Sequence, residues 1–169
     1  MFKVLANRTY RYLLLAQIAA LLGTGLATVA LGLLAYDLAG GDAGAVLGTA
    51  LAIKMVAYVG VAPVASAFTS RLPRLRTLVL LDLIRASLVV FLPFVTEVWQ
   101  IYLLVFLLQS ASAAFTPTFQ ATIPDILPDE KDYTNALSLS RLAYDLESLA
   151  SPVIAASLLG IISYNSLFW

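Results

Sequence analysis

The chain has 169 residues, of which 61% are hydrophobic and 12% are charged, and its mean hydropathy is +0.91. A soluble domain is about half apolar and about a quarter charged, so this composition indicates a multi-pass membrane protein. Ten basic and ten acidic residues cancel, which argues against nucleic acid as a partner. The absence of cysteine and histidine excludes disulfides, His-based metal sites and Ser-His or Cys-His catalysis. We therefore expect no metal site and no cofactor.

Five apolar segments predict five membrane-spanning helices, because each is near or above the ~20 residues needed to cross a bilayer. They cover residues 10–36, 45–68, 77–95, 98–119 and 135–160. The expected fold class is all-α, a multi-pass transmembrane helical bundle. Residues 1–169 are expected to form one partial bundle with no second domain. The connections predicted between the segments include a turn over residues 37–44 and a loop over residues 124–132.

Lysine and arginine gather on one side of the predicted bundle. The basic residues before the first segment and after the second are Lys3, Arg8, Arg11, Arg71, Arg74 and Arg76, whereas loops 37–44 and 96–98 contain none. Cytoplasmic loops carry the excess of such residues, so we expect a cytoplasmic N-terminus. A further apolar run begins near Trp169, which we interpret as a truncation within a larger membrane protein.

Two segments align their polar residues on one helical face. The first carries Gln17, Thr24 and Thr28, and the fourth carries Gln109, Ser112, Thr116 and Gln120. Such stripes either line an aqueous pathway or join helices through hydrogen bonds worth about 0.6 kcal/mol each. Because two segments show the same alignment, we favour the pathway.

Charges within the predicted spans are functional candidates, because each costs about 2.5–3.5 kcal/mol in a bilayer. Lys54 lies near the centre of the second segment. It could bind an anionic substrate, take part in proton coupling, or form a structural pair with Asp145 or Glu147. These alternatives stay open. Asp82 and Arg85, three positions apart, are expected to form a local structural pair.

The fifth segment, residues 135–160, has a polar side and an apolar side. At about 100° per residue, one stripe contains Ser138, Arg141, Asp145, Ser148 and Pro152, and the adjacent stripe contains Ser140, Tyr144, Glu147 and Ser151. Arg141 and Asp145 could pair at i, i+4. Glu147 is then the acid with the least local compensation.

Three passages carry a family resemblance. Residues 66–76, Ser-Ala-Phe-Thr-Ser-Arg-Leu-Pro-Arg-Leu-Arg, form a basic loop, and residues 115–125, Phe-Thr-Pro-Thr-Phe-Gln-Ala-Thr-Ile-Pro-Asp, precede Asn135-Ala-Leu. The third passage is Ser151-Pro152. In these passages the chain resembles the N-terminal half of a major facilitator superfamily transporter of the bacterial efflux-like branch. Ser66 and Ser70 stand where that family usually has glycine and an acid, and Ser151-Pro152 stands where its antiporters often have Gly-Pro.

The resemblance implies two six-helix halves, a central cavity and alternating access in a bacterial inner membrane. It implies that the first and fourth helices line the cavity and that the fifth lies near the second half. The predicted function is proton-linked efflux of a small molecule of unknown identity. Candidates for coupling or substrate contact are Lys54, Asp145 and Glu147 together with the two polar stripes, and Ser70, Arg71, Arg74 and Arg76 correspond to the cytoplasmic gating loop.

The alternative is a non-transporting membrane module, either truncated or dependent on a partner. Its partners would be membrane lipid and either the missing C-terminal half or another chain. An enzyme is not expected. Tyr36-Asp37 and Tyr144-Asp145 resemble an intramembrane aspartyl protease motif, but Asp37 falls at a predicted turn and no Gly-x-Gly-Asp accompanies them.

Overall fold

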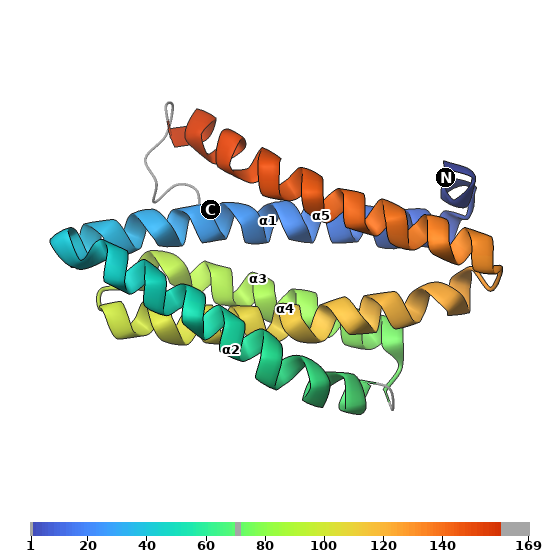
Figure 1. Ribbon diagram of the computed structural model, residues 1–169, viewed down its shortest axis with the longest axis horizontal. Helices are drawn as coiled ribbons and strands as arrows, with labels where there is room; N and C mark the ends of the chain where they lie inside the picture. The colour runs from blue at the N-terminus through green and yellow to red at the C-terminus, as the bar shows by residue number, and fades with distance from the viewer. Residues whose placement is uncertain (1, 70–71, 160–169) are drawn as a thin grey trace.

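The computed structural model describes residues 2–69 and 72–159, and Figure 1 shows them as an elongated bundle of helices. The α-helices in these ranges are α1 (Arg8–Ala39), α2 (Ala43–Thr69), α3 (Arg74–Phe91), α4 (Val98–Ile126) and α5 (Glu130–Leu159). Short 3-10 turns are η1 (Phe2–Ala6), η2 (Gly40–Asp42) and η3 (Leu92–Phe94). The described part of the chain contains no strand, so the all-α prediction is confirmed.

Three stretches of the described residues are long and apolar enough to cross a membrane. They are Arg8–Ala65, which includes α1 and most of α2, then Arg74–Phe94 and Val98–Ile126. These stretches support the predicted multi-pass fold. The α5 helix is not among them, and crossing by α5 stays a prediction. The end of that predicted span, Gly160, lies outside the described residues.

The predicted turn over residues 37–44 is shorter in the structure. The α1 helix continues to Ala39 and α2 begins at Ala43. Gly40 makes this possible, because its φ of +52° lies in the left-handed region that favours glycine. Its backbone N–H donates to the carbonyl of Tyr36, which closes the last turn of α1.

The predicted loop over residues 124–132 is also shorter. The α4 helix runs through Pro117 and Pro124 to Ile126, and α5 begins at Glu130. Proline within a helix is tolerated in membrane bundles, where neighbouring groups satisfy the freed backbone. The carboxylate of Asp129 accepts the backbone N–H of Asp132 at 3.1 Å, and this cap favours an early start of α5.

The helices pack in two neighbouring groups. The α2 and α3 helices pack against α4, and α1 packs against α5. In Figure 1, α5 and α2 lie on opposite sides of the bundle, with α1, α3 and α4 between them. The hydroxyl of Tyr10 in α1 donates to the carbonyl of Ala136 in α5 at 2.9 Å, which fixes the register of that helix pair.

Two apolar clusters form the core, and a polar layer lies between them along α1 and α4. One cluster includes Leu31 and Leu34 of α1 with Ile101 of α4. The other includes Leu14 of α1 and Phe119 of α4. Gln17 and Thr24 of α1 and Gln109 and Ser112 of α4 lie between these clusters in sequence, so the core itself places this part of the polar stripes near the middle of the bundle.

Candidate functional site

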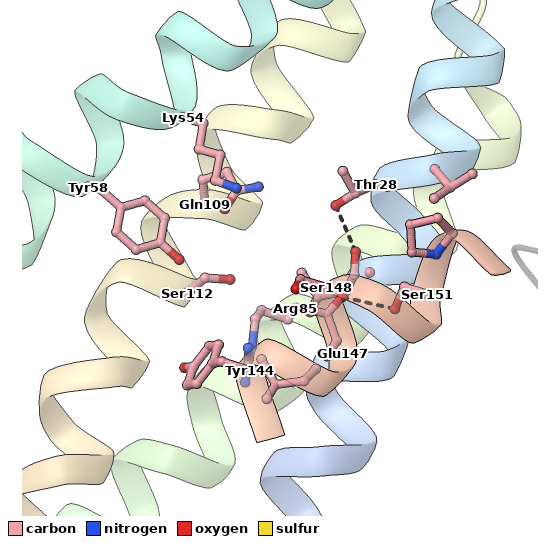
Figure 2. Close-up of a pocket in the computed structure, with 15 residues that line it drawn as sticks. Thr28, Lys54, Tyr58, Arg85, Gln109, Ser112, Tyr144, Glu147, Ser148 and Ser151 are labelled. Carbon is pink, nitrogen blue, oxygen red and sulfur yellow. Dashed lines mark hydrogen bonds between the residues drawn. The ribbon is translucent and has the colours of Figure 1, made fainter. Parts of the chain in front are cut away.

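A cavity of about 300 Å³ occupies the polar layer, as Figure 2 shows. It is lined by residues of all five helices, with α1, α2, α4 and α5 contributing most of the wall. The polar residues that line it are Thr24, Thr28, Lys54, Tyr58, Arg85, Gln109, Ser112, Tyr144, Glu147, Ser148 and Ser151. The structure therefore brings together predicted candidates from the first, second, fourth and fifth segments.

Glu147 lies at a close contact between α5 and α1. Its Oε1 accepts a hydrogen bond of 2.9 Å from the hydroxyl of Ser151, drawn as a dashed line in Figure 2. A β-carbon at Gly25 of α1 would overlap with both of these polar atoms and would lie 2.7 Å from Cβ of Ser151. Glycine at this position thus allows the carboxylate to rest against α1 while it lines the cavity.

Lys54 enters the cavity from α2 and is partly buried. Figure 2 shows its side chain beside Gln109, across the cavity from Glu147. Within the described residues Lys54 forms no ion pair, so the possible structural pairs with Asp145 and Glu147 are not formed in this structure. Lys54 also borders two neighbouring cavities of about 80 and 640 Å³, and it therefore lies where the three hollows meet.

Arg85 reaches the cavity from α3, a role that the sequence analysis did not predict. The expected pair with Asp82 is present. Arg85 is also buried, with its side chain 8% exposed, and its guanidinium lies 4.3 Å from the ring centroid of Phe115 in α4. An arginine within so apolar a helix is costly in a membrane. This cost was the feature of the sequence that could have marked Arg85 as a functional candidate. The contact with the Phe115 ring could not be predicted from the sequence, because it depends on how α3 packs against α4.

The two polar stripes of α5 have different surroundings. Arg141 and Asp145 form the expected pair at 3.2 Å, with side chains 79% and 58% exposed. Neither of them lines the cavity, although Ser148 and Pro152 farther along the same stripe do. The adjacent stripe, which includes Tyr144 and Glu147, faces the other helices. The structure thus separates the two acids that the sequence left as joint candidates.

Gln17 does not line the cavity either. It is 1% exposed and pairs with Ser140 of α5 through two hydrogen bonds. The Gln17 amide nitrogen donates to the Ser140 hydroxyl at 2.8 Å, and the hydroxyl lies 3.1 Å from the amide oxygen. Here the polar residue joins two helices, which was the alternative to a pathway.

The C-terminal part of the polar stripe of α4 borders the larger of the two neighbouring cavities. Thr116 and Gln120 line that space of about 640 Å³ together with Lys54. Tyr58 and Tyr144 line both this cavity and the one that contains Glu147. The hydroxyl of Tyr144 lies 3.2 Å from that of Thr116, so this tyrosine links α5 to α4 between the two spaces. Tyr58 lies four positions after Lys54 on α2 and was not among the residues predicted to line a cavity.

The basic loop is described in part. Ser70 and Arg71 lie outside the described residues. Arg74, at the start of α3, pairs with Asp125 at 2.7 Å and also donates to the carbonyl of Ala121. Arg76 is exposed and lines a surface cavity of about 660 Å³ together with Arg74 and Asp125. Pro152 of α5 lines the candidate cavity.

The family model described as Major Facilitator Superfamily matches residues 13–169. Neither a curated protein nor a solved structure gives a significant match.

Proposed function

Since the chain belongs to the major facilitator superfamily of membrane transporters, we propose that it forms part of a secondary active transporter that exports a small molecule in exchange for protons. The observation that carries this proposal is the position of Glu147. Its carboxylate lines a cavity in the polar layer of the bundle and forms no ion pair with any residue in the described ranges.

Protonation of Glu147 changes the net charge of this cavity. The titratable groups that share the cavity with it are Lys54 and Tyr58 of α2, Arg85 of α3 and Tyr144 of α5. The lining residues of α1 and α4 are not titratable. Glu147 is thus the only acid among the cavity's described residues, and its protonation leaves only the positive charges of Lys54 and Arg85. A proton gradient can act on a binding site through such a change.

The direction of transport rests on the resemblance to efflux proteins. Residues 115–125 of α4 and Ser151-Pro152 of α5 are the passages similar to that branch. Ser151 also donates to Glu147, so the antiporter-like passage is in direct contact with the proposed proton site. We place the N-terminus in the cytoplasm of a bacterial cell, with Arg74 and Arg76 at the inner face of its inner membrane.

The outer surfaces of the bundle must contact either lipid or protein. Large apolar side chains of α3, such as Val79, Leu80 and Leu83, are exposed, and we assign them to lipid contact. The exposed pair of Arg141 and Asp145 on α5 does not suit lipid. We propose that α5 faces a second helical bundle, supplied by the rest of the transporter or by another chain.

A partner-dependent module without transport activity is the alternative. The exposed charge pair on α5 agrees with both proposals, because such a surface needs a partner in either case. Cross-linking of the chain in mild detergent distinguishes the versions of this alternative. Monomer alone would contradict dependence on a second copy.

The transport proposal is tested by neutralising Glu147 in the intact protein. Inverted bacterial membrane vesicles receive a mixture of water-soluble metabolites, and respiration acidifies their interior. Mass spectrometry then identifies molecules that accumulate only when the protein is present. We expect Glu147→Gln to abolish accumulation driven by the pH gradient, whereas Glu130→Gln, an exposed glutamate on the same helix, should retain it. Equal gradient dependence in both variants would remove Glu147 from the mechanism.

A further inference from the structure

The candidate cavity contains two opposite charges that do not contact each other. Lys54 comes from α2 and Glu147 from α5, and both line the same space of about 300 Å³. No ion pair joins them, and neither has an ion-pair partner elsewhere in ranges 2–69 and 72–159. Figure 2 shows Lys54 beside Gln109 on one side and Glu147 beside Ser151 on the other.

This separation is unusual for charges inside a membrane protein. Ionisable residues in such helices almost always pair with one another or with backbone carbonyls, because an unpaired charge is costly there. Arg85 and Asp82 follow that rule, as do Arg141 and Asp145. Lys54 and Glu147 do not, and the space between them is open to a ligand with one positive and one negative end.

We propose that the substrate is a small zwitterion, with an ammonium group that binds Glu147 and a carboxylate or similar anionic group that binds Lys54. Arg85 lines the same cavity and strengthens the positive side. This inference rests on the proposed transport function and names its substrate class. A purely anionic molecule would be repelled by Glu147, and a purely cationic one by Lys54 and Arg85.

The size and lining of the cavity fit a molecule of amino-acid dimensions. Its volume of about 300 Å³ is at the lower end of the range for ligand pockets, about 300–1,000 Å³. Leu21 and Val29 contribute apolar walls, and Tyr58 and Tyr144 contribute rings with hydroxyl groups. An apolar or aromatic side chain on the zwitterion would contact these surfaces.

A zwitterion also accounts for exchange with protons. The ammonium group and a proton both neutralise the Glu147 carboxylate, so the two compete for it. Binding of one favours release of the other. The substrate leaves when Glu147 is protonated, and the proton leaves when the ammonium group arrives, which is the relationship that an antiporter requires.

The inference is tested with matched sets of probes and the intact protein in detergent. One set is phenylalanine, phenethylamine and 3-phenylpropionate, and the other is leucine, isoamylamine and 4-methylpentanoate. Each set keeps the apolar body and removes one charge. Calorimetry at neutral pH should give at least one amino acid a Kd lower than that of both analogues by about tenfold or more.

Variants assign the two ends of the ligand. Glu147→Gln should remove the preference for the amino acid over the matching acid, and Lys54→Gln should remove its preference over the matching amine. Glu130→Gln and Lys131→Gln, both exposed on α5, are controls that should keep both preferences. The double variant Lys54→Gln/Glu147→Gln should lose both. If Lys54 and Glu147 only neutralise each other's charge, the double variant should instead recover wild-type binding.

Two outcomes would overturn the inference. The first is that neither amino acid binds more tightly than both of its analogues, and the second is recovery of binding in the double variant. Neither decides the transport proposal, because accumulation of another molecule that depends on Glu147 in the vesicle experiment would still support it. Loss of that dependence would contradict the transport proposal itself.

Discussion

Gly25 of α1 lies directly against the carboxylate of Glu147 of α5. Any β-carbon at Gly25 would overlap with Oε1 of Glu147 and with the hydroxyl of Ser151. The absence of a side chain on one helix therefore determines where the acid of the other helix can lie. Close approach of this kind is a general use of small residues in membrane helix contacts.

Replacing Gly25 with alanine should destabilise the protein and displace Glu147. Overpacking of a well-packed contact costs about 1–3 kcal/mol, which thermal unfolding of the purified protein in detergent would detect as a lower Tm. Gly23→Ala is the matched control, because nothing lies within 4 Å of a β-carbon at Gly23. Its Tm should be unchanged or higher, since alanine favours helix over glycine by up to about 1 kcal/mol. Equal Tm values for the two variants would contradict the close contact.

Gln17 and Ser140 should behave as a coupled pair. Each is buried, and removing either partner leaves a polar group unsatisfied, which costs about 1–3 kcal/mol. Gln17→Leu and Ser140→Ala should each lower the Tm, and the double variant should lose less than the sum of the two. Ser138→Ala is the control, because among the described residues its exposed hydroxyl bonds only to the Thr134 carbonyl. Strict additivity in the double variant would indicate that the two side chains do not interact.

The side-chain contacts near the site show how far the sequence could predict it. Asp82–Arg85 and Arg141–Asp145 were predictable, because spacings of three and four depend only on helix geometry. Gln17 and Ser140 are 123 positions apart, and their pairing depends on how α1 slides and rotates against α5. Periodicity within one helix contains no information on that register. The same limit left Gln17 assigned to a pathway.

The lining of the cavity was predictable only in part, because periodicity shows which face of a helix is polar but not which helix packs against that face. The stripes placed Thr24, Thr28, Gln109 and Ser112 on interior faces, and all four line the cavity. Arg85 was assigned to a supporting helix, because its position against α4 depends on tertiary packing. The helix ends were less predictable still. Proline and charged residues over 124–132 suggested a loop, whereas most of that range is helical.

Arg74 and Asp125 should contribute little to stability despite their contact of 2.7 Å. Their side chains are 36% and 58% exposed, and exposed ion pairs are worth about 0–1 kcal/mol and are screened by salt. Arg74→Gln and Asp125→Asn should therefore lower the Tm only slightly, and less so at high ionic strength. Arg76→Gln, which removes an exposed arginine without an ion pair in the described ranges, serves as the control. A large, salt-independent loss for Arg74→Gln would show that its bond to the Ala121 carbonyl dominates.

Arg85 should contribute much more than Arg74, because it is 6% exposed and pairs with Asp82 inside the apolar α3 helix. Removing one partner of a buried pair leaves an uncompensated charge and costs about 3–5 kcal/mol. Arg85→Gln should therefore lower the Tm strongly, and Arg85→Gln/Asp82→Asn should recover part of the loss.

Arg85→Lys separates the charge from the guanidinium plane. Lysine keeps the positive charge, but it cannot reproduce the planar contact with the Phe115 ring at 4.3 Å. We expect a Tm between those of the wild type and Arg85→Gln, because the lost ring contact is worth about 0.5–2 kcal/mol of stability. Phe115→Leu tests the same contact from the other side. In that background Arg85→Lys should cost less than in the wild type, and an unchanged cost would show that the ring contributes nothing to holding Arg85 at the cavity.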